Sequence, residues 1–332
     1  MILIGNASDV IKSLPDESVN CIVTSPPYYG LRDYGVDGQI GLEPTLKEYL
    51  DKMVLLFDGL RRVLRKDGTC WVNMGDSYSY SGKCETKTGK QATNKGSVKP
   101  GRDMTSEGML PKNLMGVPWR LAFALQDAGW YLRSDIIWHK PNPMPESVTD
   151  RPTKAHEYIF LLTKSDRYWY DADAVKEKAA GGILKVPEGW DNTVGNGSHG
   201  SIKKGRVPGA NSRVNVARNH GGACPSQRDE SSLSVSALGI AETRNARTVW
   251  TIPVSGYTKA HFATFPPEIP KRCILAGCPE GGTVLDPFAG SGTTIAVAKA
   301  IGRIAIGIEL NPEYAEMARQ RVGDTTPSLF MG

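Results

Sequence analysis

The sequence of 332 residues predicts an α/β fold in which helices cover both faces of a parallel sheet. Two apolar runs, residues 19–24 and 69–74, are typical of strands buried on both faces. The segment between them, 45–64, has apolar residues at helical spacing. Strand and helix patterns alternate again over residues 283–322, and the hydrophobic fraction of 40% is enough for a substantial core.

The individual elements follow from the spacing of apolar residues and from turn and cap signals. In the first part of the chain we expect strands at 1–6, 19–24 and 69–74 and helices at 8–14 and 45–64, with Lys66-Asp67-Gly68 ending the second helix. The middle part predicts a helix at 118–128 and strands at 131–139 and 157–163. The closing part predicts helices at 266–276, 293–301 and 312–322 and strands at 283–287 and 303–309, and Asn311 followed by Pro312 is typical of a helix start.

Two basic stretches interrupt this pattern. Residues 79–112 contain seven Lys or Arg against three Asp or Glu, which predicts a long loop that is functional or disordered. Residues 176–250 contain eleven Lys or Arg against six Asp or Glu and show no helical or strand period. This second stretch is interpreted as a separate basic module, with a solvated linker as the alternative. The chain therefore divides into 1–175, an insert at 176–250, and 251–332.

The composition restricts the class of protein. No apolar run reaches the roughly 20 residues of a membrane span, and the first residues lack a signal-peptide pattern, so we expect no membrane association and a cytoplasmic location. The six cysteines have no paired short spacing and no two histidines have metal-ligand spacing, so we expect reduced cysteines and no metal site. The net charge of +5 is too small to identify a partner by itself.

A rigid polar turn, Ser25-Pro26-Pro27-Tyr28, follows the strand at 19–24. The prolines keep Ser25 and the neighbouring carbonyls out of a helix, and Tyr28 adds a flat ring beside these hydrogen-bond acceptors. Such a turn fits a planar ligand with N–H donors, for example a nucleobase with its exocyclic amine. A stiff turn with a packed tyrosine is the alternative.

A second site is predicted at residues 286–292, Asp-Pro-Phe-Ala-Gly-Ser-Gly, with Glu309 at the end of the following strand. In such a βαβ unit, glycine backbone approaches a ligand and the carboxylate binds the ribose of a nucleoside. Ile295 replaces the third glycine of a dinucleotide fingerprint, and no lysine precedes Thr293 as in a P-loop. S-adenosyl-L-methionine is therefore the candidate ligand, with Asp286 as a second carboxylate for its cationic end, and a tight turn without a ligand is the alternative.

These motifs resemble those of the amino-group DNA methyltransferases, which modify cytosine N4 or adenine N6. Residues 25–28 are similar to the family's catalytic motif, residues 286–292 to its cofactor motif, and residues 261–266 to its first helix motif. The likeness covers nearly the whole chain except the basic stretches. Because the catalytic motif comes first, the order resembles the permuted β-type subgroup. The resemblance implies a Rossmann-like, seven-stranded S-adenosylmethionine-dependent methyltransferase sheet, circularly permuted, with one reversed strand and basic inserts.

The resemblance also implies the residues of the site. The catalytic residues would be Ser25, Pro26, Pro27 and Tyr28. The cofactor would be bound by Asn6, Ala7, Phe265, Asp286, Phe288, Ala289, Gly290, Gly292, Thr293 and Glu309. Where the family often has aspartate this chain has Asn6, an amide that donates and accepts hydrogen bonds. Residues 1–175 would form the catalytic half, 251–332 the cofactor-binding half, and 176–250 the target-recognition insert.

The expected reaction begins with a nucleotide flipped out of the duplex, because its amine is otherwise inaccessible. Tyr28 would stack on the extruded base, which is worth about 1–3 kcal/mol. The Ser25 hydroxyl and the Pro26 carbonyl would accept the two N–H groups of the amine and aim its lone pair at the methyl group, so that positioning does most of the work. A cysteine nucleophile, as in cytosine C5 methylation, is not required, and Cys224 lies in the glycine-rich insert.

We therefore expect a DNA methyltransferase of double-stranded DNA, with cytosine N4 favoured over adenine N6 because serine begins the catalytic motif. A non-catalytic nucleic-acid-binding protein with the same fold is the alternative from another class. The basic stretches would contact phosphates, and the candidates for guanine contacts are Arg206, Arg213, Arg218, Arg244 and Arg247. Candidate protein partners are a cognate restriction endonuclease, as in a restriction-modification system, and a second copy of the chain.

Overall fold

The computed structural model describes residues 1–31, 33, 35–79, 109–178, 243–254 and 266–323. The chain forms two compact units, one made of Met1–Lys176 with Asn245–Gly332 and the other of Glu177–Arg244. In the second unit the described residues are two short antiparallel strands, β6 (Glu177–Lys178) and β7 (Thr243–Arg244). Most of both basic stretches lies outside the described residues, as do Phe265, Arg206, Arg213 and Arg218.

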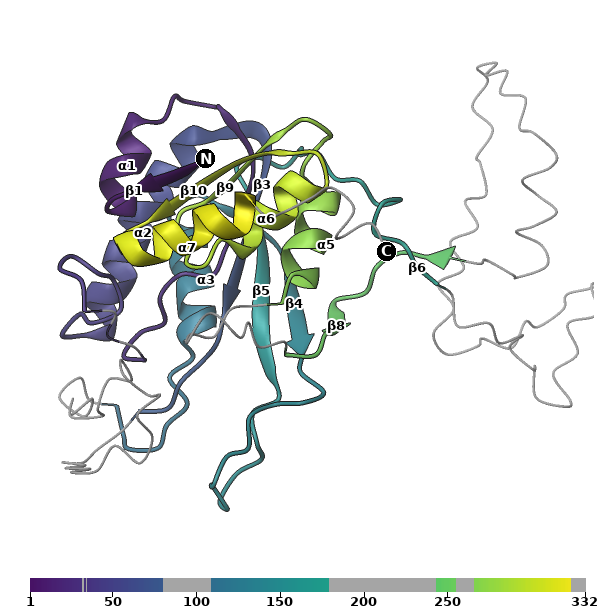
Figure 1. Cartoon of the computed structure of the whole chain (residues 1–332). Helices are drawn as coiled ribbons and strands as arrows, with labels where there is room; N and C mark the ends of the chain where they lie inside the picture. Colours follow the sequence, from purple (N-terminus) through teal and green to yellow (C-terminus); the bar gives the residue numbers. More distant parts are fainter. Residues whose placement is uncertain (32, 34, 80–108, 179–242, 255–265, 324–332) are drawn as a thin grey trace, which may run out of the picture. The chain divides into compact units, whose positions relative to one another are not determined.

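The first unit is built on one sheet, which has eight strands among the described residues (Figure 1). In spatial order they are β1 (Ile2–Ile4), β10 (Ile304–Glu309), β9 (Thr283–Asp286), β2 (Val19–Thr24), β3 (Leu64–Met74), β5 (His156–Thr163), β4 (Tyr131–His139) and β8 (Val249–Thr251). Strand β5 runs antiparallel to both of its neighbours, and all other pairs in this sheet are parallel. The expected α/β class and the single reversed strand are confirmed.

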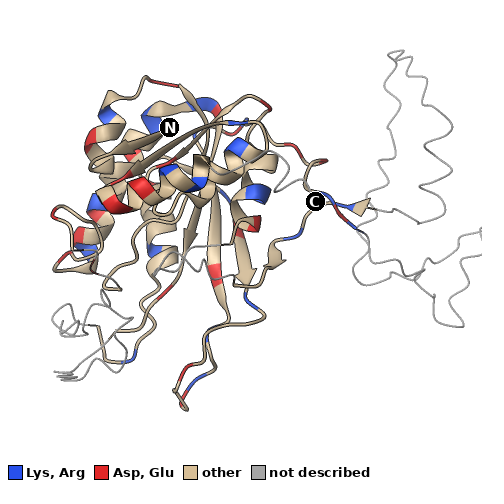
Figure 2. Cartoon of the chain, in the orientation of Figure 1, with Lys and Arg blue, Asp and Glu red and all other residues tan. Residues whose placement is uncertain are grey.

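Helices cover both faces of this sheet (Figure 1). Helices α1 (Ala7–Ser13), α2 (Leu46–Val63) and α3 (Val117–Asp127) pack into one hydrophobic core, and α5 (Glu268–Gly277), α6 (Thr293–Ala300) and α7 (Pro312–Gly323) pack into another. In β3 the side chains alternate between them, because Cys70 and Val72 join the first core and Trp71 the second. Charged residues accordingly lie mainly on helices and loops (Figure 2).

Helix α2 follows its sequence signals at the start and departs from them at the end. Thr45 caps it, since the Thr45 hydroxyl oxygen accepts a 3.1 Å hydrogen bond from the Glu48 amide. The predicted helix, 45–64, agrees with α2 to within one residue at each end, but residues 66–68, expected as the turn that ends it, lie in β3, which begins at Leu64. The strand pairing of β3 with β2 is irregular there, and Gly68 has no room for a Cβ, which would lie 2.9 Å from the Asn20 carbonyl oxygen.

Strand β8 was not predicted, since the sequence up to residue 250 showed no strand period. Three residues are too few to show a period, and tertiary contacts hold them in place. Trp250 is buried against Trp71, with ring centroids 6.4 Å apart. The Trp138 indole N–H donates a 2.8 Å hydrogen bond to the Ile252 carbonyl just beyond β8. The sheet therefore has eight strands among the described residues, one more than the seven expected, and the additional strand, β8, lies at its edge.

The topology brings the two predicted sites together at the carboxyl ends of neighbouring strands. Strands β2 and β9 are parallel neighbours, so the turn after β2 and the glycine loop after β9 emerge side by side at their carboxyl ends. Within the described ranges no helix is long and apolar enough to cross a membrane. The same ranges contain no group of three or more His, Cys, Asp or Glu that could hold a metal ion. The four cysteines of these ranges are buried and unpaired.

Candidate functional site

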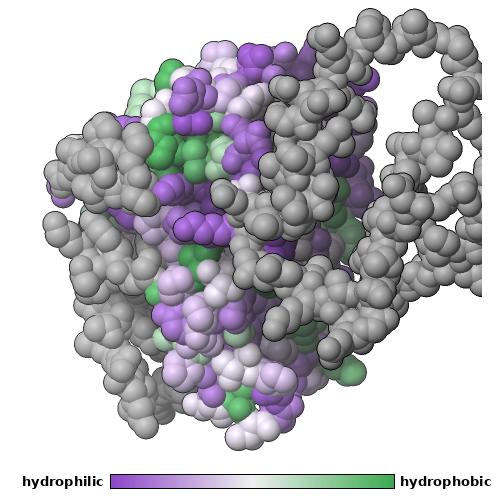
Figure 3. All heavy atoms as spheres, turned by 90° about the vertical axis from the view of Figure 1, so that its right-hand side faces the viewer, coloured by the Kyte–Doolittle hydropathy of each residue, from purple (hydrophilic) through white to green (hydrophobic). Residues whose placement is uncertain are grey.

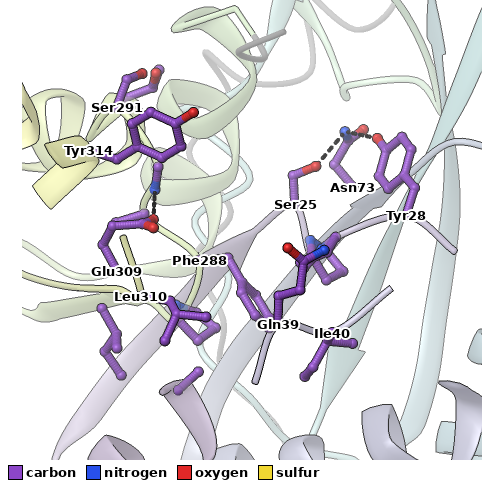
Figure 4. Close-up of a pocket in the computed structure, with 18 of the residues that line it drawn as sticks. Ser25, Tyr28, Gln39, Ile40, Asn73, Phe288, Ser291, Glu309, Leu310 and Tyr314 are labelled. Atoms are coloured by element: carbon purple, nitrogen blue, oxygen red, sulfur yellow. Dashed lines mark hydrogen bonds between the residues drawn. The ribbon is translucent and has the colours of Figure 1, made fainter. Parts of the chain in front are cut away.

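A cavity of about 260 Å³ opens where the carboxyl ends of these parallel strands meet. It brings together most of the residues predicted from the sequence: Asn6, Ala7, Ser25, Pro26, Pro27, Tyr28, Phe288, Ala289, Gly290, Thr293 and Glu309. Figure 4 shows the Ser25 and Tyr28 side chains on one side of this cavity and Glu309 with Tyr314 on the other. Two motifs that lie more than 250 residues apart therefore line one space.

The turn at residues 25–28 is fixed from several sides. The Tyr49 hydroxyl, from α2, donates a 2.9 Å hydrogen bond to the Pro27 carbonyl. The Asn73 side chain, near the end of β3, donates to the Ser25 hydroxyl oxygen at 3.4 Å and to the Tyr28 hydroxyl oxygen at 3.1 Å (Figure 4). No hydrogen bond from the described part of the chain reaches the Pro26 carbonyl. The turn thus presents the Ser25 oxygen and the Pro26 carbonyl oxygen as acceptors in a fixed geometry.

Glu157, in β5, connects the tyrosine to the wall of the cavity. One of its carboxylate oxygens accepts a 2.7 Å hydrogen bond from the Tyr28 hydroxyl and a 3.1 Å bond from Asn73 Nδ2. Burial, with the nearby Glu157 charge as the second cause, raises the pKa of Tyr28 well above its ordinary value. Tyr28 therefore stays protonated and holds its ring in place as a hydrogen-bond donor.

Lys140, which follows β4, forms an ion pair with the other oxygen of Glu157. Both side chains are largely buried, with 18% and 15% of their surface exposed, and both line the cavity. The Lys140 ammonium also lies 4.3 Å from the centroid of the Trp138 ring. An ammonium at this position offers further N–H donors to a ligand in the same end of the cavity.

The opposite end of the cavity is formed by the glycine loop and Glu309. The Glu309 carboxylate accepts hydrogen bonds of 2.8 Å from the Gly290 amide and from the Asn311 amide. Figure 4 shows one hydrogen bond at this carboxylate. Burial raises the pKa of Glu309 above its ordinary value, although these amide donors oppose the rise. Gly290 has a φ of 51° and an ideal Cβ there would have no atom within 4 Å, so its backbone faces open space. Both features suit a ligand with hydroxyl groups.

Two predicted cofactor residues, Asp286 and Gly292, do not line the cavity. The Asp286 carboxylate is buried below the loop, where it accepts hydrogen bonds from the Thr24 hydroxyl at 2.8 Å and the Thr294 hydroxyl at 2.7 Å. Burial raises the pKa of Asp286 to about 6. At Gly292, with a φ of 78°, a Cβ would lie 2.9 Å from the Ala318 Cβ of α7, so this glycine permits close packing of the helices. Both residues shape the loop from outside the cavity.

Asn6 lines the cavity while its side chain is engaged locally. Its amide oxygen caps α1 by accepting a 2.9 Å hydrogen bond from the Ser8 amide, and its Nδ2 donates to the Gly38 carbonyl at 3.1 Å. Ala7 is buried next to it.

Sequence reasoning did not identify Asn73 and Glu157 as site residues. A signal was present in each case, since Asn73 is a polar residue inside an otherwise apolar strand run and Glu157 begins such a run. A polar side chain that is buried in such a run requires a hydrogen-bond partner, and this requirement indicates a candidate site residue. The sequence does not show that β3 and β5 are neighbours, and so it does not show that these residues meet at Tyr28.

The arrangement suits two ligands that meet in one space. The Glu309 end offers a carboxylate, glycine backbone and the Phe288 ring, as a nucleoside requires. The Ser25 end offers fixed acceptors, a flat ring and the Lys140 ammonium, as a planar base with an amine requires. The described residues that line this end include no cysteine and no histidine. Transfer of a group between the two ligands is the chemistry that fits this arrangement best.

Comparison with known proteins gives relatives over nearly the full length. Residues 19–320 match the family model of the N6/N4 DNA methylases. The chain is 43% identical to the type II methyltransferase M.SmaI of Serratia marcescens, over 97% of this chain and 90% of the relative. It is 44% identical to the type II methyltransferase M.Cfr9I of Citrobacter freundii, over 96% of this chain and 86% of the relative.

Solved structures show the same fold at low identity. The cytosine-N4-specific PvuII DNA methyltransferase is 19% identical with a TM-score of 0.56, covering 97% of this chain and 85% of that protein. A DNA modification methylase from Thermus thermophilus, solved with S-adenosyl-L-methionine, is 20% identical with a TM-score of 0.53, covering 98% of this chain and 96% of that protein. These similarities confirm the Rossmann-like sheet.

Proposed function

The chain belongs to the N6/N4 family of DNA methylases, and from this membership we propose that it transfers a methyl group from S-adenosyl-L-methionine to the N4 amine of a flipped cytosine in double-stranded DNA. The observation that carries the proposal is the shared cavity, in which Ser25 and Tyr28 face the same space as Gly290 and Glu309. Methyl transfer requires both partners in one space, with the amine and the methyl group adjacent.

The described residues fit the methyl donor. The Gly290 backbone faces open space, which leaves room for a ligand against the loop. The Glu309 carboxylate, oriented by two backbone amides, would accept hydrogen bonds from the ribose hydroxyls. Phe288 and Ile308 offer apolar surface for the adenine ring. Bound there, S-adenosyl-L-methionine supplies an already activated methyl group, so the protein has to position its acceptor and exclude water.

The other end of the cavity would hold the flipped base. Tyr28 would stack on the ring, while the Ser25 oxygen and the Pro26 carbonyl would accept the two N–H groups of the amine. These hydrogen bonds favour a pyramidal nitrogen whose lone pair points at the methyl group. Asn73 and Glu157 hold Ser25 and Tyr28 in the orientation that this step needs.

Cytosine N4 is preferred over adenine N6 because the catalytic motif begins with Ser25. The Lys140 ammonium adds support, since cytosine carries the acceptors N3 and O2 beside its amine. Adenine N6 is the second candidate, because its amine also lies next to a ring nitrogen that accepts hydrogen bonds. We assign target recognition to residues 176–250 and phosphate contacts to both basic stretches, from their charge. A cognate endonuclease, a second copy of the chain and the cytoplasmic location remain predictions.

The test is to identify the methylated nucleoside. Purified protein would be incubated with methyl-labelled S-adenosyl-L-methionine and mixed-sequence DNA, and the DNA digested and analysed by mass. N4-methylcytosine is expected. N6-methyladenine would show that adenine is the methylated base, while methyl transfer to an exocyclic amine would still be the reaction. The product 5-methylcytosine would overturn the mechanism. Binding with a steep salt dependence but without methyl transfer would favour the non-catalytic alternative.

Matched variants connect the product to the cavity. The substitution Ser25→Ala removes the predicted acceptor and should reduce turnover more than a hundredfold while cofactor affinity stays within threefold. Ser13→Ala changes an exposed serine at the end of α1 and should leave turnover unchanged. Mapping modified bases in DNA from cells that express the chain would give the sequence context needed for the next experiment.

A further inference from the structure

The loop between β4 and β5, residues 140–155, projects from the edge of the sheet at which the cavity lies (Figure 1). Strand β4 runs antiparallel to β5, which runs antiparallel to β3, so β4 ends at the same edge as β3 and β2. Lys140 at the start of the loop and Glu157 just beyond its end both line the cavity. A duplex whose flipped base occupies this cavity must therefore pass beside the loop.

The start of the loop is rigid. Residues 141, 143 and 145 are prolines, which fix their own φ and hold Asn142 and Met144 in extended conformations. The Asn142 side chain donates a 3.1 Å hydrogen bond to the Val254 carbonyl and accepts a 2.8 Å bond from the Val254 amide. The Lys140 backbone amide donates a 2.8 Å hydrogen bond to the Ala155 carbonyl, and this bond joins the first and last residues of the loop. The first part of the loop is thus held in one place relative to the cavity.

Charged side chains of the loop are used to brace it. Arg151 forms a 2.6 Å ion pair with Glu146, and its guanidinium lies 4.0 Å from the centroid of the Tyr78 ring. Asp150 pairs with Lys112 at 2.6 Å. These contacts tie the loop to itself and to the segments that hold Tyr78 and Lys112.

Met144, in the proline-rich first part of the loop, is 83% exposed, the highest value among the exposed large hydrophobic residues of the described ranges. Figure 3 shows apolar residues at the lower end of the molecule, where the loop lies, surrounded by hydrophilic ones. A single exposed apolar residue is ordinary by itself. Met144, however, lies between Pro143 and Pro145, in a loop that is fixed by hydrogen bonds and ion pairs and that begins at the cavity residue Lys140.

We infer that Met144 enters the base stack of the duplex at the place that the flipped nucleotide leaves, an assignment that rests on the proposed function. Met144 is the fourth residue after Lys140, so its Cα lies at most about 14 Å from that of Lys140 in the cavity wall. This reach is comparable to the width of the major groove, about 12 Å. Methionine is unbranched and its sulfur contacts aromatic faces favourably, and it is among the apolar wedges that proteins insert between bases.

The test compares two DNA substrates that carry the mapped target site. In one the target base is correctly paired, and in the other it is mismatched, so that extrusion costs less. The substitution Met144→Ala should lower kcat/KM about tenfold on the paired duplex and less than twofold on the mismatched one. Met144→Leu, which keeps an apolar side chain of similar volume, should stay within twofold of the wild type on both. Because Met144 is exposed, the melting temperature of each variant should not change.

Two controls separate the wedge from a general role of the loop. Val148→Ala removes a less exposed apolar side chain, 39% exposed, from the same loop, and Leu55→Ala removes a similarly exposed one, 74% exposed, from α2. Both should leave the ratio between the substrates unchanged. With 2-aminopurine paired with thymine at the target position, binding of the wild type should increase the 2-aminopurine fluorescence, and binding of Met144→Ala should increase it less.

Several results would overturn the assignment. Equal losses on paired and mismatched DNA would mean that Met144 supports folding or general binding. If Met144→Ala loses no kcat/KM on either substrate, Met144 does not act as the wedge. The same holds if Val148→Ala changes the ratio between the substrates as much as Met144→Ala does. If the wild-type protein methylates no DNA, the proposed function fails and the assignment fails with it. If the wild type methylates and Met144→Ala behaves like it, only the assignment fails.

Discussion

The Thr24 hydroxyl donates a 2.8 Å hydrogen bond to the Asp286 carboxylate, and both groups are buried. Thr24 is the last residue of β2, directly before the Ser25 turn, and Asp286 is the last residue of β9, directly before the glycine loop. The same carboxylate accepts hydrogen bonds from the Phe288 amide and the Thr294 hydroxyl. One buried group therefore fixes the glycine loop and the Ser25 turn relative to each other.

Removal of this bond should reduce both stability and activity. Thr24→Val keeps the shape of the side chain and leaves one carboxylate oxygen of Asp286 without its hydroxyl donor. The loss of a hydrogen bond to a buried charged group predicts a decrease of about 1–3 kcal/mol in the free energy of unfolding, measured by urea denaturation at pH 8. Thr24→Ser keeps the hydroxyl and should recover most of the stability. If Thr24→Val is as stable as the wild type, the two motifs are held by other contacts.

The raised pKa of Asp286, about 6 against an ordinary 3.8, predicts a pH dependence of stability. Since the folded pKa is the higher one, the stability contribution is complete below about pH 4 and is lost as the pH rises through 6, by roughly 3 kcal/mol in total. Asp286→Asn does not titrate. The wild type should therefore become less stable relative to this variant between pH 4 and pH 7, as followed by urea unfolding at each pH.

Local signals in the sequence predicted the elements well where one segment determines its own structure. The strand at 19–24 has the predicted bounds because a continuous apolar run is buried on both faces of the sheet. Helix α2 begins where Thr45 caps it. The Lys-Asp-Gly sequence at 66–68 was misinterpreted because the same residues suit a helix end and an irregular strand. The choice between them depends on pairing with β2, which is distant in the sequence.

The site was predictable in its motifs and not in its supporting contacts. Ser25, Tyr28, Gly290 and Glu309 could be selected because each lies at or just after the end of a strand in a recognisable pattern. Asn73 and Glu157 reach Tyr28 only through the antiparallel pairing of β3 with β5, in which Met74 lies opposite Tyr158. For Asp286, the spacing identified the residue, while the direction of its carboxylate was set by Thr24 on the neighbouring strand.

The ring and the hydroxyl of Tyr28 should make separable contributions. Tyr28→Ala removes the stacking surface and should lower kcat/KM for DNA by about 10- to 100-fold, as expected for 1–3 kcal/mol of stacking. Tyr28→Phe keeps the ring and loses its 2.7 Å hydrogen bond to Glu157, so a smaller decrease is expected. Steady-state kinetics with DNA as the varied substrate measures both. The affinity for S-adenosyl-L-methionine should change less than threefold, and an equal effect on cofactor binding would show that the two ends of the cavity are not independent.

Glu309→Gln should weaken the binding of S-adenosyl-L-methionine selectively. Both oxygens of the Glu309 carboxylate accept hydrogen bonds of 2.8 Å from backbone amides, one from Gly290 and one from Asn311. Glutamine has one oxygen, so its NH₂ group must face one of these amides, and a donor facing a donor displaces either the glycine loop or the start of α7.

We expect the dissociation constant, measured by calorimetry without DNA, to increase at least tenfold, with turnover at saturating cofactor less affected. Glu313→Gln, at an exposed position in the first turn of α7, is the matched control and should bind the cofactor like the wild type. Equal affinity of Glu309→Gln and the wild type would place the ribose elsewhere, because a carboxylate aimed by two backbone amides is the group best suited to accept both ribose hydroxyls at this end of the cavity.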